Sequence, residues 1–144
     1  MKIRRVLNEL NSRFVYQTDT VQYGTVELWR FMHGEVYTGD CEDYALTLAY
    51  LLADRSAYQL LRQVLSGRSQ FHFYRHKATG DGHLALWYED GVTYVACTVT
   101  RQWAVGDGLL HRYGYEHKYR VRPVRVAVKL IAGQFALMVR KLFA

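Results

Sequence analysis

The stretch "YTGDCEDYALTLAYLL", residues 37–52, decides the fold class. From Cys41 onward it is apolar at nearly every position beyond the first turn, and this pattern predicts a helix that is buried on all sides. Gly39 or Asp40 can cap the helix, and the acidic residues of its first turn suit the positive end of the helix dipole. A thiol, Cys41, therefore stands at the start of a buried helix, among carboxylates that oppose its ionisation.

Hydrophobic spacing on either side of this stretch predicts helices first and strands afterwards. An amphipathic helix is expected over residues 3–14, a loop with a short helix over 19–36, and a further helix over 56–66 that ends at Gly67. One face of the 56–66 helix is expected to carry four apolar residues. These are Tyr58, Leu61, Val64 and Leu65.

The apolar period then shifts from the helical value to two, which is typical of strands. The strands are expected at "QFHFYRH" (70–76), "HLALWYE" (83–89), "VTYVACTVT" (92–100) and "YRVRPVRVAVKL" (119–130), with a closing helix over 131–144. An Asp-Gly pair at 90–91 predicts a tight hairpin turn. The chain is therefore expected to be α+β, with the buried helix packed on an antiparallel sheet.

Length and composition indicate a compact, ordered protein. The chain has 144 residues, half of them hydrophobic, and one proline, so a single domain spanning 1–144 is expected, without disorder except at the ends. No apolar run reaches the roughly 18 residues of a membrane span. The amphipathic N-terminus is unlike a signal peptide, so a cytoplasmic location is expected by default.

The positive charge is concentrated near the C-terminus. Residues 111–144 hold eight lysines and arginines against one glutamate, whereas the rest of the chain sums to −1 of the total +6. This segment is either a solvated strand face or a surface for an anionic partner such as nucleic acid, an anionic membrane or an acidic protein.

The two cysteines and one histidine are the candidates for chemistry. Cys41 and Cys97 are too few for a disulfide framework and are interpreted as free thiols, with a disulfide between them as the alternative. Amides at a helix N-terminus stabilise a thiolate and can hold an oxyanion, so Cys41 is placed to act as a nucleophile. His83, which opens a strand after Gly-Asp-Gly, is the candidate base. The alternatives are two ordinary core residues, or a metal site that adds Cys97.

The heptapeptide "GDCEDYA" at 39–45 resembles the bacterial transglutaminase-like cysteine proteinases, of the papain-like superfamily. The supporting segments are "ELWRFMHGEVYTGDCEDYALTLAYLL" (27–52), "GHLALWYEDG" (82–91) and, more loosely, "VTYVACTVT" (92–100). The resemblance implies a papain-like/transglutaminase-like fold, with Cys41 as nucleophile and His83 as general base and acid. It implies a peptidase or amidase that acts on a protein or peptide through a thioester.

Further expectations come from the same resemblance. Adhesin-cutting members depend on calcium and bind it through acidic residues beside the cysteine, here Asp40 and Glu42. A bound Ca²⁺ reverses the effect of these carboxylates on the thiol, whereas the alternative is that they only cap the helix. Trp29, Trp87 and Trp103 fall in or near the segments around the site and are candidates to line the cleft.

The chain departs from the family pattern at the third catalytic position. An aspartate that orients the imidazole is expected near "ACTVT", where Cys97, Thr98 and Thr100 stand instead. Asp90 and Asp107 lie elsewhere in the sequence. Two functions therefore stay open: a hydrolase with a Cys-His pair, and a catalytically degenerate binding or assembly module whose cleft holds a partner protein.

Overall fold

The computed structural model describes residues 2–16 and 37–143. The elements, in chain order, are α1 (Lys2–Arg13), β1 (Phe14–Tyr16), β2 (Tyr37–Gly39), α3 (Cys41–Leu52), α4 (Ala57–Ser66), β3 (Ser69–His76), β4 (Gly82–Asp90), β5 (Val92–Ala96), β6 (Ala104–Val105), α5 (Gly108–Arg112), β7 (Tyr115–Arg120) and α6 (Pro123–Phe143). The segment 19–36, where a loop and a short helix were expected, lies outside the described residues.

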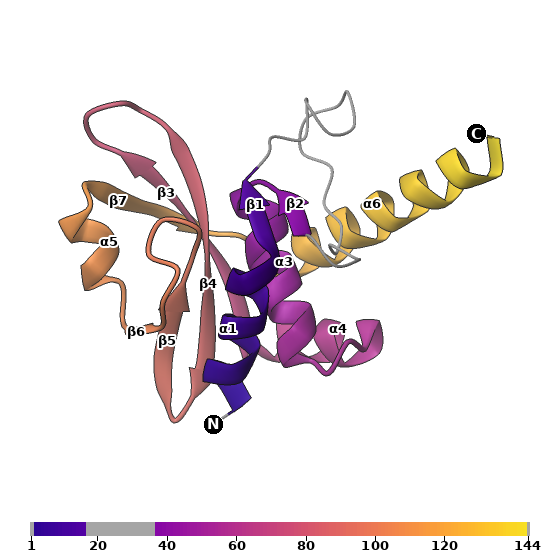
Figure 1. Ribbon diagram of the computed structural model, residues 1–144, viewed down its shortest axis with the longest axis horizontal. Coiled ribbons are helices and arrows are strands. Elements are labelled where there is room, and N and C mark those ends of the chain that lie inside the picture. The colour runs from indigo at the N-terminus through magenta and orange to yellow at the C-terminus, as the bar shows by residue number, and fades with distance from the viewer. Residues whose placement is uncertain (1, 17–36, 144) are drawn as a thin grey trace.

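The main sheet has five antiparallel strands in the order β6-β5-β4-β3-β7. Helices α3 and α1 lie against one of its faces. Helix α5 lies beside β7 on the side of the sheet away from them (Figure 1). A parallel pair, β1 and β2, joins the end of α1 to the start of α3. The expected α+β architecture, with a buried helix packed on an antiparallel sheet, is confirmed.

Helix α3 is the centre of the core, as its sequence predicts. Nine of its twelve residues are buried, and its contact with the sheet is mainly with β4. Leu84, Leu86 and Tyr88 alternate along β4 and face the helices, where they join the larger hydrophobic cluster. Because the remaining residues of β4 point to the other face, a smaller cluster with Ala85, Val95 and Cys97 forms there.

The hairpin and the second helix follow their local signals. Asp90 pairs with Val92, and Gly91 between them has a φ of +80°, which glycine adopts without strain. Ser56 caps α4, and Gly67 ends it in a left-handed conformation. The face predicted for α4 is only partly right, because Val64 is buried as expected but Tyr58 and Leu65 are not. The helix buries Leu60 and Val64, whereas Tyr58 is 66% and Leu65 is 55% exposed.

The strand predicted over residues 119–130 is also wrong. Strand β7 ends at Arg120, and a 21-residue helix, α6, begins at Pro123 and absorbs the closing helix expected over 131–144. Proline suits the first position of a helix because it lacks the N–H that this position leaves unpaired. Val126 and Leu130, four residues apart, are buried on one side of α6, which packs against α4. The valine alternation was therefore not a strand signal.

Helix α6 runs away from the sheet, and its C-terminal part extends beyond the other elements (Figure 1). Its exposed side carries Val124, Val128 and Ile131. No helix within 2–16 or 37–143 combines the length and the apolarity that a membrane crossing requires.

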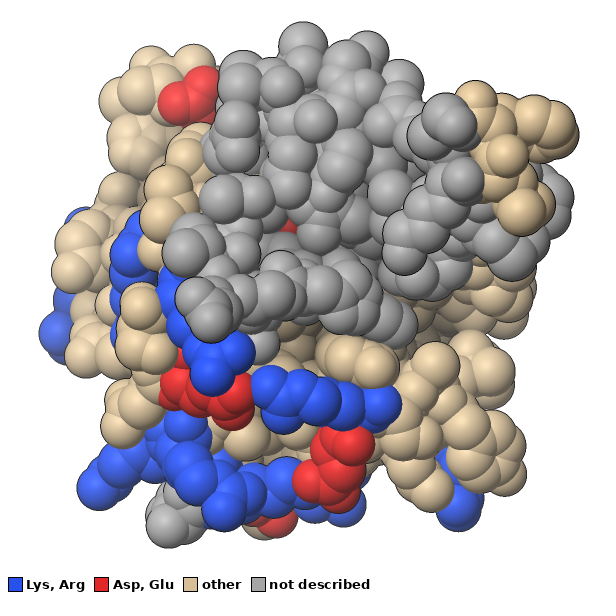
Figure 2. Space-filling model, turned by 45° about the vertical axis from the view of Figure 1, so that its right-hand side comes forward, with Lys and Arg blue, Asp and Glu red and all other residues tan. Residues whose placement is uncertain are grey.

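Charged side chains on the lower part of the face in Figure 2 are mixed in sign. Two ion pairs join α1 to the turn after α3. Lys2 Nζ lies 2.8 Å from Asp54 Oδ1, and Arg55 Nη2 lies 2.7 Å from Glu9 Oε1. Exposed ion pairs of this kind contribute little to stability individually.

Candidate active site

The start of α3 is held by a capping box. Asp40 Oδ1 accepts hydrogen bonds from the backbone N–H groups of Glu42 (3.0 Å) and Asp43 (3.1 Å), and Asp43 Oδ2 accepts one from the N–H of Asp40 (3.2 Å). Gly39 is needed beside this box, because a Cβ added there would lie 2.5 Å from Asp43 Cβ. Asp40 and Asp43 therefore cap the helix, while the role of the Glu42 side chain stays a prediction.

Cys41 and His83 line one cavity. The thiol comes from the first residue of α3 and the imidazole from the second residue of β4. The backbone N–H of Leu84, next to His83, donates a hydrogen bond to the Cys41 sulfur. The cavity measures about 520 Å³. Its lining residues come from five parts of the chain: Tyr16, Cys41, Asp81, Gly82, His83, Thr98, Val99, Arg101 and Tyr115.

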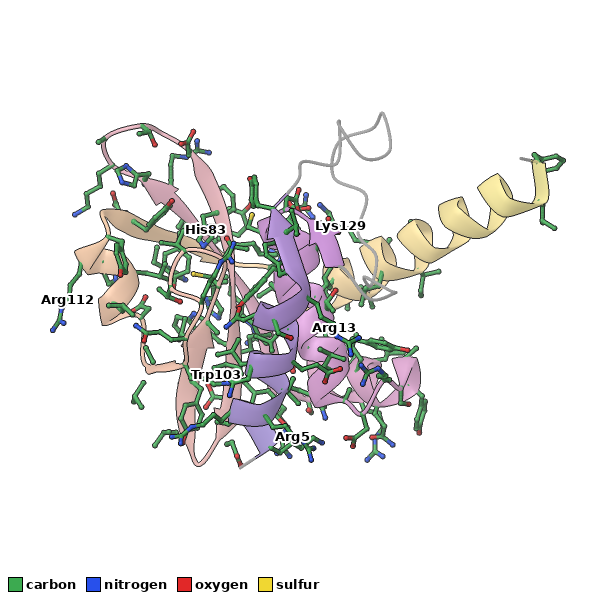
Figure 3. All side chains as sticks on the ribbon, in the orientation of Figure 1. Arg5, Arg13, His83, Trp103, Arg112 and Lys129 are labelled. Atoms are coloured by element: carbon green, nitrogen blue, oxygen red, sulfur yellow. The ribbon has the colours of Figure 1, made fainter. Side chains whose placement is uncertain are left out.

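His83 is buried, and its Nε2 atom has no hydrogen-bond partner among the described residues. The residue is 5% exposed. Figure 3 shows His83 where side chains of the sheet meet those of the helices. Its ring centroid lies 5.0 Å from that of Tyr115. A buried polar atom without a partner costs free energy, and here it borders the cavity that holds the thiol.

Burial keeps both groups neutral at pH 7. It raises the pKa of Cys41 to about 12, and the negative charges of Asp40 and Glu42 add to the increase, whereas the hydrogen bond from Leu84 opposes it. Burial also lowers the pKa of His83 to about 4. At pH 7 the cavity is therefore lined by a thiol and a neutral imidazole, not by a thiolate and an imidazolium. A neutral imidazole can still accept the proton of an attacking thiol.

No carboxylate stands at the third position. Strand β5 ends at Ala96, so Cys97 begins the turn that follows, fully buried on the same sheet face as Ala85. Its sulfur lies 3.6 Å from Thr100 Oγ1. Both cysteines are free thiols, as expected.

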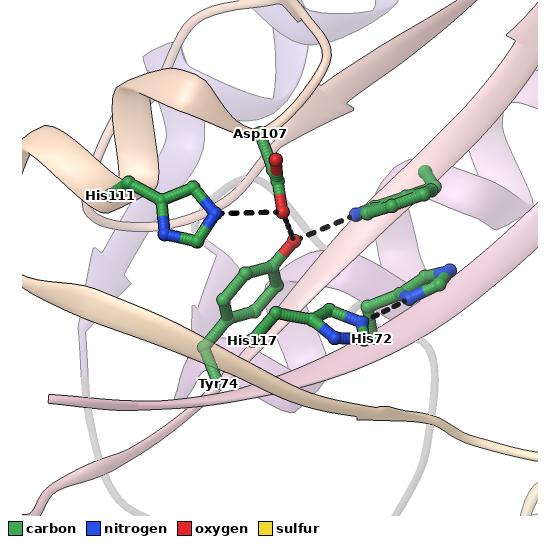
Figure 4. Close-up of polar contacts among 6 residues, drawn as sticks. His72, Tyr74, Asp107, His111 and His117 are labelled. Atoms are coloured by element: carbon green, nitrogen blue, oxygen red, sulfur yellow. Dashed lines mark hydrogen bonds and ion pairs between the residues drawn. The ribbon is translucent and has the colours of Figure 1, made fainter.

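Asp107, the other acid considered, belongs to a separate polar network (Figure 4). Its Oδ2 accepts a hydrogen bond from the Tyr74 hydroxyl at 3.0 Å and lies 3.3 Å from His111 Nε2. The Tyr74 hydroxyl in turn accepts a hydrogen bond from Trp87 Nε1 at 3.0 Å. Although Tyr74 pairs with His83 across the strands, its hydroxyl is committed to Asp107.

The tryptophans expected near the cleft have different places. Trp87 stacks on His72, with 3.6 Å between the ring centroids, and does not line the cavity of Cys41. Trp103 donates a hydrogen bond to the carbonyl of Ile3 at 2.8 Å and so fastens the sheet edge to α1. Trp29 lies outside the described residues.

Sequence reasoning missed most of the cavity wall. Tyr16, Arg101 and Tyr115 are brought there by β1, the turn after β5, and β7. No local motif marks them, because each is far from "GDCEDYA" in the sequence. Asp81 stands in the Gly-Asp-Gly before His83, and its charge was a signal that could have been used.

The described residues by themselves do not make up a complete calcium site. Ca²⁺ takes six to eight oxygen ligands, whereas no group of three or more His, Cys, Asp or Glu side chains within 2–16 and 37–143 is arranged to hold a metal ion. The Asp40 carboxylate is already an acceptor for two N–H groups. We therefore derive no catalytic step through calcium.

A scan of the sequence against protein-family models gives no match, and a search among curated proteins also gives none. Two solved structures of LapG from Legionella pneumophila are similar to the chain. The calcium-bound LapG matches with a TM-score of 0.52 at 17% identity, and the other with 0.50 at 15%. Each match covers 83% of this chain and 65% of the LapG chain, so this chain spans just under two thirds of LapG. These similarities confirm the papain-like/transglutaminase-like fold, and the catalytic roles of individual residues stay predictions.

Proposed function

We propose that the protein is a thiol-dependent hydrolase, a peptidase or amidase, with Cys41 as nucleophile and His83 as general base. The observation that carries this proposal is the shared cavity. It is lined both by the thiol at the start of α3 and by a buried imidazole whose Nε2 has no hydrogen-bond partner within 2–16 and 37–143. The fold, and the resemblance of "GDCEDYA" to the transglutaminase-like cysteine proteinases, support the same roles.

The proposed reaction starts from the neutral pair. The sulfur attacks the carbonyl carbon of a protein or peptide while His83 takes the thiol proton, and His83 then protonates the departing amine as the tetrahedral intermediate collapses to a thioester. Water hydrolyses the thioester and restores the thiol. The N–H groups of Glu42 and Asp43 are occupied by Asp40, so we assign the developing oxyanion to the N–H of Cys41.

The test is acylation of Cys41 by an activated ester, p-nitrophenyl acetate, at pH 7. We expect the acetyl group on the peptide that contains Cys41, as shown by mass spectrometry. The His83→Ala variant keeps the thiol but loses the base, and we expect its acylation rate to fall about 100-fold or more.

Two variants control this experiment. Cys41→Ala must form no adduct, and Cys97→Ala must react as the parent does, because Cys97 is fully buried. Acylation of His83→Ala at the parental rate would show that His83 is not the base. Peptide hydrolysis that survives in Cys41→Ala would refute the nucleophile.

A second candidate function is a binding or assembly module that has lost catalysis. It is favoured by the neutral state of both groups and by the buried Cys97 where the family has its orienting aspartate. In that case the parent and His83→Ala both form the thioester no faster than the uncatalysed reaction does. The cavity would still bind a partner protein.

Calcium and an anionic partner are tested separately. Calcium at Asp40 and Glu42 stays a prediction from the resemblance. Acylation rates measured with Ca²⁺ and with a chelator test it.

The anionic partner is proposed for the groove where β7 meets α6, because Arg120, Arg122 and Arg125 line it together with exposed valines. Binding there should weaken steeply with salt.

A further inference from the structure

Arg101 forms part of the wall of the Cys41 cavity. It lies in the turn after β5, sixty positions from the thiol in the sequence. Its backbone φ is +49°, in the left-handed region that a residue with a side chain rarely adopts. Such a conformation persists only where the surrounding contacts impose it.

Four contacts hold Arg101 in this conformation. Its N–H donates to the carbonyl of Cys97 at 2.8 Å, and its own carbonyl accepts from Asn11 Nδ2 at 2.8 Å. Its Nε donates to the carbonyl of Thr98 at 3.1 Å. The guanidinium lies over the ring of Phe14, with 5.2 Å from Cζ to the ring centroid. The contacts come from α1, β1 and the turn itself, so both backbone and side chain are fixed.

Among residues 2–16 and 37–143, no hydrogen bond or ion pair engages the terminal nitrogens of this guanidinium. Within the described part of the chain, no carboxylate forms an ion pair with Arg101. Among the described residues that line the cavity it is the one arginine or lysine, while Asp81 supplies a negative charge. A fixed planar guanidinium matches a carboxylate through two parallel hydrogen bonds.

We propose that Arg101 is a carboxylate-binding subsite beside Cys41, so that substrates of this site carry a carboxylate near the carbonyl that the thiol attacks. The substrate class is then an acidic peptide or an amide of an amino acid with a free carboxylate. This inference rests on the proposed function for its substrate, but the subsite itself is tested with reagents that need no catalysis.

Two alkylating reagents of nearly equal size provide the test. Iodoacetate carries a carboxylate and iodoacetamide does not. The rates of both are measured at Cys41 by peptide mass spectrometry at pH 8.5, and their ratio is divided by the ratio for N-acetylcysteine. We expect this normalised ratio to fall about three- to tenfold in Arg101→Gln, with the iodoacetamide rate unchanged.

Three further variants make the result specific. Arg101→Gly also removes the guanidinium, and it tolerates the positive φ, so it should lower the ratio without unfolding the turn. Arg101→Lys keeps the charge and should retain part of the ratio. Arg112→Gln removes the same charge from α5, at the left edge of the molecule in Figure 3 and outside the set of residues that line the cavity, and should leave the ratio unchanged.

A ratio that stays at the parental value in both Arg101→Gln and Arg101→Gly would overturn the subsite. So would an equal fall in Arg112→Gln, because that reports only the net charge of the protein. His83→Ala should leave the ratio intact. If ester acylation fails while the ratio depends on Arg101, the hydrolase proposal fails and the carboxylate subsite stands.

Discussion

Asp40 has two effects that a pair of substitutions can separate. Its carboxylate oxygen caps α3, and its charge raises the pKa of Cys41. Asp40→Asn keeps the capping oxygen and removes the charge, whereas Asp40→Ala removes both. Loss of the cap and of the charge at the helix N-terminus should lower the free energy of unfolding by about 1.5 kcal/mol in Asp40→Ala, and loss of the charge alone by about 0.5 kcal/mol in Asp40→Asn.

For a chain of this size these changes correspond to a melting temperature lowered by about 5 °C and about 2 °C. The thiol should respond in the opposite sense. Both variants should lower the pKa of Cys41, so that iodoacetamide reacts faster at pH 8.5, with a tenfold larger thiolate fraction for each pKa unit, or about 1.4 kcal/mol.

The assays are thermal unfolding followed by circular dichroism, and alkylation rates against pH. Asp90→Asn, which removes an exposed charge in the hairpin, controls for net charge and should leave the alkylation rate unchanged. Equal destabilisation by Asp40→Asn and Asp40→Ala would refute the capping argument. An alkylation rate that does not rise in Asp40→Asn would refute the electrostatic one.

Three further predictions concern stability. His83 is neutral when folded, with a pKa of about 4, and takes up a proton near pH 6.5 when unfolded, so it alone should account for a loss of about 2 kcal/mol of unfolding free energy between pH 7.5 and pH 5. Denaturant titrations should show that loss to be smaller in His83→Gln, and an equal loss would contradict the burial argument. Leu46→Ala removes a fully buried side chain of α3 and should cost about 2–5 kcal/mol in the same assay. Gly39→Ala pushes a Cβ into Asp43 and should cost about 1–3 kcal/mol, with a cost near zero showing that the capping box can shift.

Much of the fold was predictable because its strongest signals are local. The run from Cys41 to Leu52 is apolar enough to specify a buried helix, and Asp40 caps it as its chemistry requires. The alternation in residues 70–76 and 83–89 specified two strands, which lie within β3 and β4. For the same reason a shared site for Cys41 and His83 could be proposed, and both residues line one cavity.

The errors arose where local pattern and tertiary packing disagree. Residues 123–130 alternate valine with other residues and so imitate a strand, but Pro123 starts a helix there, and Val126 and Leu130 are buried at helical spacing. On α4, Tyr58 and Leu65 are apolar enough to be placed in the core, yet the packing of the helix leaves them exposed.

The sequence alone determined the buried helix, its cap and the identity of the thiol and imidazole, because these depend on neighbours a few residues apart. Only the tertiary structure decided the state and surroundings of that pair. Burial makes both groups neutral, and the wall with Tyr16, Arg101 and Tyr115 is assembled from segments up to about a hundred residues apart. Desolvation and long-range convergence are properties of the packed molecule, and no local pattern encodes them.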